Sequence, residues 1–143
     1  MLPLHIQGLL TVVHSPLTLK NTIMIKNILL VGTGGALGSI ARYLITCLFT
    51  YLSIYSELAT LLVNILGSFI IGLLIPASQN AMYFLMAVGF CGGFTTFSTF
   101  SAQAFQMLQN GQRLSSVIYI LASVIISIAF VFLGFYLSEK YIK

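Results

Sequence analysis

Residues 89–100 have the sequence Gly-Phe-Cys-Gly-Gly-Phe-Thr-Thr-Phe-Ser-Thr-Phe, within a run of residues that is apolar enough to cross a membrane. Two adjacent glycines weaken a helix, and the hydroxyl side chains that follow them favour the start of a new one. In hydrocarbon an unpaired backbone group is costly, so a broken helix persists only where it is buried in protein or lines a cavity. This stretch therefore predicts a helix break at mid-membrane and a candidate binding or conduction site there.

The composition is that of an integral membrane protein. Of the 143 residues, 59% are hydrophobic and 6% are charged, whereas soluble domains have about 25% charged residues. The net charge of +4 comes from six basic and two acidic residues. The four lysines lie towards the ends of the chain, where cations meet a membrane surface, so they do not indicate a nucleic-acid-binding protein. Cys47 and Cys91 fall in apolar segments, as small apolar side chains do.

Apolar runs of about 20 residues mark membrane-spanning helices. The sequence predicts four of them, at residues 27–52, 58–75, 82–108 and 114–137, with the third broken near its middle. Short linkers make consecutive helices antiparallel neighbours, and four spans place both ends of the chain on one side. The few charges favour an inside location for that side. We expect an all-α integral membrane protein with four transmembrane helices.

The first residues do not form a clean span. Residues 1–23 contain two prolines and two histidines, and no basic residue precedes Lys20, so they lack the pattern of a signal peptide. The sequence Met24-Ile25-Lys26 looks like a natural beginning. We therefore interpret residues 1–23 as a disordered or non-native leader without a function, and residues 24–143 as the membrane domain.

Small and polar residues recur at helical spacing within the spans. Gly34 and Gly38 are four apart in the first span, and Ser123 and Ser127 are four apart in the fourth, where Tyr119 precedes them by the same interval. Residues at this spacing share a helix face. Such a face allows close packing of membrane helices. Packing is the favoured interpretation for the two glycines, whereas packing and function remain equally open for the two serines.

Arg42 and Asn64 are polar residues inside predicted spans. A charged side chain in a span costs about 2.5 kcal/mol or more and usually faces a cavity or a partner. Arg42 either does this or extends its long side chain to the membrane interface. Asn64 lies centrally in the second span, where it either bonds another helix or lines a pore. Its amide offers two hydrogens, which suits an anion.

The break itself leaves the sign of a bound ion open. A helix that ends near Gly92 presents carbonyl oxygens, which suit a small hard cation. A helix that begins between Thr95 and Ser98 presents N–H groups, which suit an anion. Phe97 and Phe100 share one face just after the break. They either pack against lipid or another helix, or turn their positive ring edges to an anion.

Several functional classes lack the residues they need. Glu57 and Glu139 are the only acidic residues, and both lie at span ends. The sequence therefore offers no buried carboxylate for a proton-coupled exporter of the small multidrug type, which is also a four-span dimer. No Cys–His cluster suits a transition metal, and no catalytic triad is present, so we expect no enzyme. A non-transporting membrane scaffold remains an alternative.

From about Lys26 to its C-terminus the chain resembles the Fluc/CrcB family of fluoride channels. Three matches in order carry the resemblance. Residues 34–43 have the sequence Gly-Gly-Ala-Leu-Gly-Ser-Ile-Ala-Arg-Tyr, and the second span contains Val63-Asn64 with Gly67 and Phe69. The most specific match is the stretch at residues 89–100.

The resemblance implies a channel that exports fluoride passively and selectively, reducing fluoride toxicity, as a multi-pass protein of the cell membrane. It also implies a dual-topology homodimer of two antiparallel subunits with two fluoride pores. Because some members of the family work as pairs of paralogues, a heterodimer remains possible.

The resemblance further implies roles for individual residues. The residues implied at the fluoride pore are Asn64, Phe97, Phe100, Ser98, Thr99, Tyr119, Ser123 and Ser127. A structural sodium ion at the subunit interface would be held by the main-chain carbonyls of Gly92 and Thr95. Arg42 and Gln103 would have vestibular or structural roles. The family usually has a glutamate at the position of Gln103, so the loss of charge there puts an electrostatic role of that site in doubt.

Overall fold

The structure, a computed structural model, describes residues 16–76 and 80–141. Every regular element in these ranges is a helix. The elements are α2 (Pro16–Tyr51), α3 (Ser56–Leu74), α4 (Ala81–Tyr83), η1 (Phe84–Cys91), α5 (Gly92–Phe94), α6 (Phe97–Gln109) and α7 (Arg113–Tyr141). Four spans in the described ranges are long and apolar enough to cross a membrane: Leu19–Tyr51, Ser56–Leu74, Ala81–Gln109 and Arg113–Tyr141. The prediction of an all-α protein with four membrane spans is confirmed.

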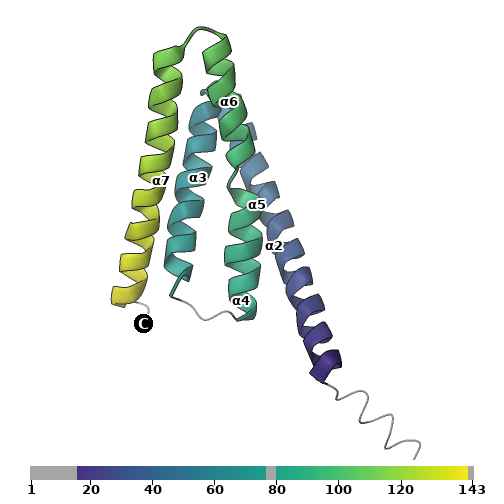
Figure 1. The fold of residues 1–143 in the computed structure, drawn as a ribbon. Coiled ribbons are helices and arrows are strands. Elements are labelled where there is room, and N and C mark those ends of the chain that lie inside the picture. The colour runs from purple at the N-terminus through teal and green to yellow at the C-terminus, as the bar shows by residue number, and fades with distance from the viewer. Residues whose placement is uncertain (1–15, 77–79, 142–143) are drawn as a thin grey trace, which may run out of the picture.

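The helices run up and down beside one another (Figure 1). Helix α3 lies between α7 and the broken third span, and α2 packs on the opposite side of that span. The Pro16 end of α2 and the Tyr141 end of α7 lie at the same end of the bundle, as expected for four antiparallel spans. The connections from α2 to α3 and from α6 to α7 lie at the other end.

Helix α2 begins earlier than the predicted first span. It starts at Pro16 and contains 36 residues, which at about 1.5 Å per residue is longer than the roughly 30 Å hydrocarbon core of a bilayer. Part of the predicted leader therefore continues α2 as a helix. Residues 1–15 lie outside the described residues, so the interpretation of the leader as non-native stays a prediction.

The third span is interrupted, and the interruption lies later than the sequence indicated. Helix α5 ends at Phe94, and Thr95 and Thr96 are extended, with φ/ψ of −77°/159° and −148°/111°. The first helix was expected to end near Gly92, but Gly92 and Gly93 are both helical and the end lies at Phe94. The second helix begins at Phe97, within the predicted range from Thr95 to Ser98. The segment before Gly92 and Gly93, η1, is a π-helix, which hydrophobic periodicity did not reveal.

Glycines bring α2 into contact with the first half of the third span. A Cβ on Gly34 would collide with the main-chain carbonyl of Leu85, and a Cβ on Gly38 would collide with that of Phe90. From the other side, a Cβ on Gly93 would collide with the carbonyl of Gly35. The two backbones therefore touch, which confirms the packing interpretation of Gly34 and Gly38.

Helices α3 and α7 meet in the same way. A Cβ on Gly72 would collide with the carbonyl of Val131, and a Cβ on Gly134 would collide with that of Phe69. Further along, α6 packs on α7 through a small core. The core consists of Phe100, Ala104 and Tyr119, with Leu61, Met107 and Ile120 against it. These contacts hold the second half of the third span beside α3 and α7.

Candidate functional site

A cavity of about 440 Å³ lies beside the break. It is bordered by α3, by both sides of the break and by α7. Its polar, glycine and aromatic lining residues are Asn64, Gly67, Ser68, Cys91, Gly92, Thr95, Thr96, Phe97, Phe100, Ser123 and Ser127. Three separate spans thus bring together five of the residues that the sequence assigned to a pore, namely Asn64, Phe97, Phe100, Ser123 and Ser127.

Asn64 forms two hydrogen bonds with the extended segment at the break. Its Oδ1 accepts a hydrogen bond from the Thr96 N–H at 2.8 Å, and its Nδ2 donates to the Thr96 carbonyl at 3.3 Å. The amide thus satisfies both main-chain groups of an extended residue, as a neighbouring strand would. Asn64 therefore bonds a neighbouring span and also borders the cavity, so the two interpretations of its position do not exclude each other.

Thr96 caps the start of α6. Its Oγ1 accepts the Thr99 N–H at 3.2 Å, which satisfies one of the free donors of the first turn. The same Oγ1 lies 3.0 Å from Thr99 Oγ1 and 3.3 Å from Ser98 Oγ. Ser98 and Thr99 are exposed and belong to this capping cluster, so the structure does not place them in the cavity with the other predicted pore residues.

These bonds release two carbonyl oxygens at the break. In an unbroken helix the Thr96 N–H would be donated to the Gly92 carbonyl, and the Thr99 N–H to that of Thr95. Asn64 and the Thr96 side chain take those hydrogens instead. Both carbonyl-bearing residues border the cavity, and a Cβ on Gly92 would have no neighbour within 4 Å.

The donor set fits the sodium ion that the resemblance implied. Unwound main-chain carbonyls and carbonyls at the ends of broken helices coordinate Na⁺ in other membrane proteins. Thr95 supplies a carbonyl of the first kind, and Gly92 one of the second. Among the described residues no group of three or more His, Cys, Asp or Glu side chains could hold a metal. A cation at the break would therefore be a hard ion held by oxygen atoms of the main chain.

Arg42 bonds the end of the first half of the third span. Its Nε donates to the Gly93 carbonyl at 3.1 Å, and Ser39 Oγ donates to the same oxygen at 3.4 Å. A cation is stabilising at the carbonyl end of a helix, so this partner explains why an arginine is tolerated inside a span. Sequence reasoning missed Ser39, although it lies three residues before Arg42 and so shares its helix face.

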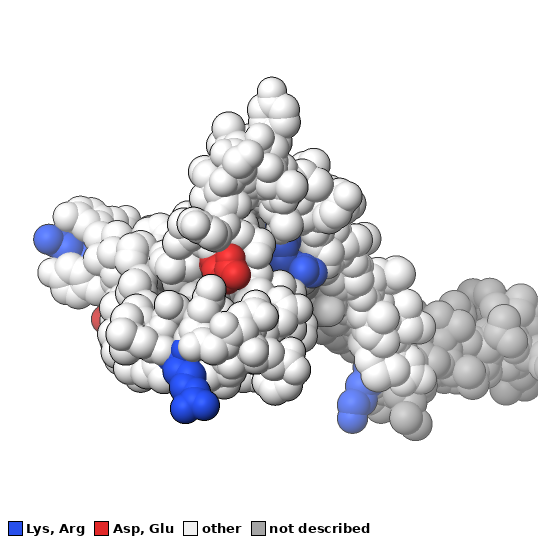
Figure 2. Space-filling view, turned by 90° about the horizontal axis from the view of Figure 1, so that it is seen from above, with Lys and Arg blue, Asp and Glu red and all other residues white. Residues whose placement is uncertain are grey.

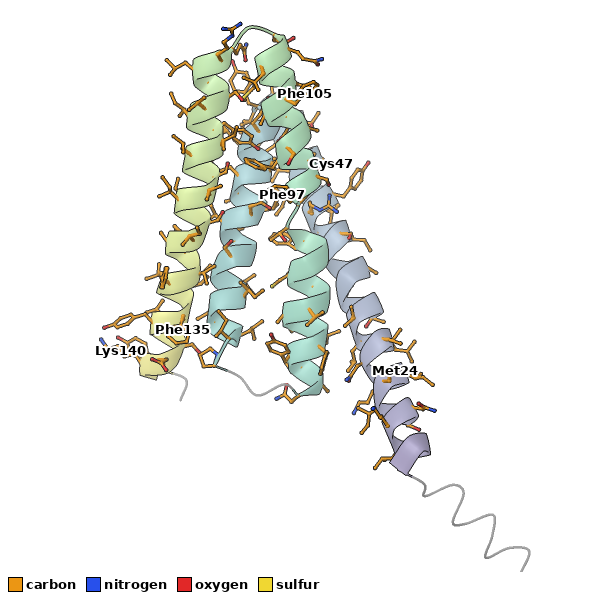
Figure 3. The ribbon with its side chains drawn as sticks, viewed as in Figure 1. Met24, Cys47, Phe97, Phe105, Phe135 and Lys140 are labelled. Carbon is orange, nitrogen blue, oxygen red and sulfur yellow. The ribbon has the colours of Figure 1, made fainter. Side chains whose placement is uncertain are left out.

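The two phenylalanines form a pair at the cavity. The ring centroids of Phe97 and Phe100 are 5.6 Å apart, with an interplanar angle of 45°. Phe97, which lies at the break in Figure 3, is 78% exposed, whereas Phe100 is 8% exposed. The Phe100 ring continues the contact to Tyr119, 5.3 Å away between centroids. An aromatic path therefore leads from the cavity towards α7.

Ser123 has an unused hydroxyl. Its side chain is 5% exposed and borders the cavity. Within residues 16–76 and 80–141, Ser123 Oγ is the one buried side-chain N or O atom without a hydrogen-bond partner. A buried polar atom without a partner costs about 1–3 kcal/mol, which makes this hydroxyl a candidate binding group of the cavity. Ser127, one turn further on, is half-buried and borders the same cavity.

Tyr119 and Gln103 lie outside this cavity and bond each other. The Tyr119 hydroxyl donates to Gln103 Oε1 at 2.9 Å, and Gln103 Nε2 donates to Ser56 Oγ at 3.3 Å. Tyr119 lines a second cavity of about 710 Å³, together with Glu57 and Arg113. Figure 2 shows the end of the bundle from above, where a few charged groups stand out on an otherwise uncharged surface.

Ser116 is a further polar residue that the sequence did not single out. Its side chain is fully buried, and its Oγ donates to the Ala104 carbonyl at 2.9 Å. The bond ties α7 to α6 near the core that contains Phe100 and Tyr119. Ser116 precedes Tyr119 by three residues and was hidden among the other serines of the span.

Known proteins match this chain along most of its length. Residues 29–135 match the family described as "CrcB-like protein, Camphor Resistance (CrcB)". A protein of Leptospira interrogans serogroup Icterohaemorrhagiae named "Fluoride-specific ion channel FluC" is 44% identical over 123 residues, which are 81% of this chain and 97% of that protein. A protein of the same name from Gloeothece citriformis is 48% identical over 119 residues, 79% of this chain and 97% of the relative. Another, from Pyrococcus abyssi, is 41% identical over 125 residues, 81% of this chain and 98% of the relative.

The matched range includes the first-span glycines, the break with its cavity, and the serines of α7. The relatives are covered almost completely by this chain. This multi-pass membrane protein therefore belongs to the CrcB family.

Proposed function

We propose that this protein is a fluoride-selective channel that lets cytoplasmic fluoride leave the cell down its electrochemical gradient. The observation that carries the proposal is the buried Ser123 hydroxyl, which lacks a protein partner and faces a cavity shared with Asn64 and two phenylalanines. The names of the relatives point to the same ion.

The chemistry of the lining suits a dehydrated anion. The described residues that line the cavity include no Asp, Glu, Lys or Arg, so neither a fixed charge nor a carboxylate competes with the ion. Ser123 and Ser127 offer hydroxyl hydrogens, and Asn64 has a second amide hydrogen beyond the one given to Thr96. Ring edges of Phe97 and Phe100 add weak positive potential. Neutral contacts of this kind bind an anion without holding it too tightly to leave.

Fluoride efflux from liposomes that contain the purified protein tests the proposal. We expect fluoride release with no measurable chloride release, and a large loss of fluoride release in Asn64→Ser and Phe100→Ile. Protein-free vesicles measure the leak of neutral HF. Absent fluoride release, or equal chloride release, would contradict the proposal. Proton-coupled uptake of an organic cation would favour an exporter, and unchanged efflux in both variants would favour a scaffold.

The exposed face of the break supports assembly into a dimer. Phe97 is 78% exposed, and Gly92, Ser98 and Thr99 are also exposed at this level of the span. Polar groups and a broken backbone facing lipid would be costly. A second copy of the chain, antiparallel as in the resemblance, would cover them. The chain expressed alone should purify with the mass of two copies, and a C-terminal tag should be cleavable from both sides of the membrane.

Two results would revise this assembly. A tag accessible from one side alone would contradict dual topology. A monomer that conducts after addition of a related chain, and not before, would favour a heterodimer of paralogues. Neither result would affect the choice of ion, because the efflux assay measures it independently.

The sodium ion is proposed to be structural, held by the main-chain carbonyls of Gly92 and Thr95 with oxygen atoms of the second copy. The release of both carbonyls by the capping bonds supports this role. The ion would fix the break, while the neighbouring side chains would contact the moving anion. Purification and reconstitution with potassium in place of sodium should lower both the unfolding temperature and fluoride efflux. Identical behaviour in both salts would contradict a sodium site.

A further inference from the structure

Four side chains form a continuous chain of hydrogen bonds between the second cavity and the aromatic path. Ser56 Oγ donates to Glu57 Oε2 at 3.3 Å, Gln103 Nε2 donates to Ser56 Oγ at 3.3 Å, and Tyr119 donates to Gln103 Oε1 at 2.9 Å. Gln103 and Tyr119 are each 8% exposed, whereas Ser56 is exposed and Glu57 half-buried. This series of hydrogen bonds therefore connects the Glu57 carboxylate, which lines the second cavity, to the buried phenol of Tyr119.

The direction of these bonds follows from donor and acceptor chemistry. A carboxylate only accepts, so the Ser56 hydrogen is given to Glu57 and only lone pairs remain for Gln103. Gln103 must then turn its NH₂ to Ser56 and its carbonyl oxygen to Tyr119. Tyr119 has a single hydroxyl hydrogen, and this arrangement commits it to Gln103.

The committed hydrogen matters because of where Tyr119 lies. Its ring packs on Phe100, which lines the cavity at the break, and Tyr119 itself lines the cavity that contains Glu57 and Arg113. Phe100 and Tyr119 together thus border both cavities, and we infer that an anion moving from one cavity to the other passes this pair. With its hydrogen given to Gln103, the phenol oxygen offers that anion only lone pairs, which repel it.

We propose that Glu57 and Ser56 are positioning residues that keep the Tyr119 hydroxyl hydrogen directed at Gln103 and so limit the rate of fluoride transfer past Phe100. The proposal rests on the fluoride channel function proposed above. If the negative charge of Glu57 is removed while its shape is kept, the chain is free to reverse. A neutral amide at that position can donate to Ser56, Ser56 can donate to Gln103, and Tyr119 can turn its hydrogen to the anion.

The charged and titratable side chains that share the second cavity with Glu57 are Arg113, Tyr55 and Tyr119. Removing the Glu57 carboxylate from the cavity that also contains Arg113 makes the potential there more positive. A more positive potential attracts anions even without a change in the hydrogen bonds. The experiment therefore has to separate an effect through the chain from an effect through space.

Fluoride efflux from liposomes is measured for Glu57→Gln, Glu57→Asp and Ser56→Ala. We expect Glu57→Gln to raise the efflux rate about twofold to tenfold, the rate equivalent of one hydrogen bond. Ser56→Ala should raise it as well, because it interrupts the chain and keeps the charge. Glu57→Asp, which keeps the carboxylate, should conduct fluoride at the same rate as the unmodified protein. Glu139→Gln removes the other carboxylate of the sequence, at the far end of α7, and should leave the rate unchanged.

The decisive comparison uses a Tyr119→Phe background, in which no hydroxyl remains to turn. The positioning role predicts that Glu57→Gln then has no effect on the rate. A rise of the same size in that background, or no rise from Ser56→Ala, would overturn the inference in favour of through-space attraction. A conducting protein in which Glu57→Gln changes nothing would overturn the inference alone, whereas an unmodified protein without fluoride efflux would overturn the channel function.

Discussion

The two halves of the third span are held in contrasting ways. Before the break, η1 and α5 lie with their backbone against α2, and glycines on both sides make that contact possible. After the break, α6 packs on α7 through aromatic side chains and is tied to it by the Ser116 and Tyr119 hydrogen bonds. The first half is positioned mainly by close backbone packing, and the second by side chains that pack and form hydrogen bonds.

This difference assigns separate tasks to the halves. A backbone-to-backbone contact leaves little freedom, because no side chain can move aside. A contact made by hydrogen-bonding side chains can exchange its partners, because the side chains can rotate. The break joins the two, and Asn64 and Arg42 hold its two sides from neighbouring helices. The cavity therefore lies where the backbone contact on α2 and the hydrogen-bonded contact on α7 meet.

Gly38→Ala tests the rigid half and should have the largest effect. The added methyl would collide with the main chain of Phe90 and Phe94, which cannot rotate away. Overpacking costs about 1–3 kcal/mol, and occasionally more, so we expect little folded protein and a strongly lowered unfolding temperature in detergent. Gly32→Ala on the same helix has no neighbour within 4 Å and should behave like the unmodified protein. Equal behaviour of the two variants would remove the contrast between the halves.

Asn64→Leu tests the break between the two halves. The substitution keeps the volume but leaves the Thr96 N–H and carbonyl without partners, each at a cost of about 1–3 kcal/mol. We expect a lower unfolding temperature and a loss of fluoride efflux of more than about tenfold. The matched control is Asn80→Ala, since Asn80 caps α4 at the surface by accepting the Tyr83 N–H. Its substitution should leave efflux intact. Normal efflux from Asn64→Leu would show that the break needs no support from α3.

Two serines of α7 test the half after the break, with smaller effects. One substitution should lower stability alone, and the other should lower efflux alone. Ser116→Ala removes a buried hydrogen bond and should cost about 1 kcal/mol of stability while efflux per folded protein stays the same. Ser123→Ala removes a hydroxyl without a partner, so stability should not fall, but efflux should decrease about tenfold. Thermal unfolding and efflux measured on both variants provide the comparison. If both lost stability equally and neither lost efflux, Ser123 would be a packing residue like Ser116.

The features that depend on local composition could be predicted from the sequence. Hydropathy located the four spans, and the spacing of Gly34 and Gly38 indicated a packed face. The glycines and hydroxyls of the third span indicated a break, and the resemblance picked out Asn64, Phe97 and Phe100, which the structure brings to one cavity. Their roles in conduction stay predictions.

The features that depend on partners from distant parts of the chain could not be predicted. The break lies at Thr95 and Thr96, where Asn64 of α3 accepts the Thr96 N–H. In a continuous helix that N–H would be donated to the Gly92 carbonyl. Gly92 and Gly93 were expected to break the helix, yet both are helical, and Gly93 packs on the backbone of α2. Nothing local connected Gln103 to Ser56, which lies 47 residues away.

The π-helix η1 also has an evolutionary consequence. Its hydrogen bonds reach from each residue to the fifth one before it, so each turn holds more chain than an α-helical turn does. A one-residue deletion within Phe84–Cys91 would return this segment to α-helical winding, while α4 and α5 remain as anchors on either side. Ala87 and Cys91 of η1 line the cavity, and the backbone of η1 packs on α2, so a change of length there would move the cavity wall. Single-residue insertions and deletions among descendants of this gene should therefore be rarer in η1 than in the connections between the spans.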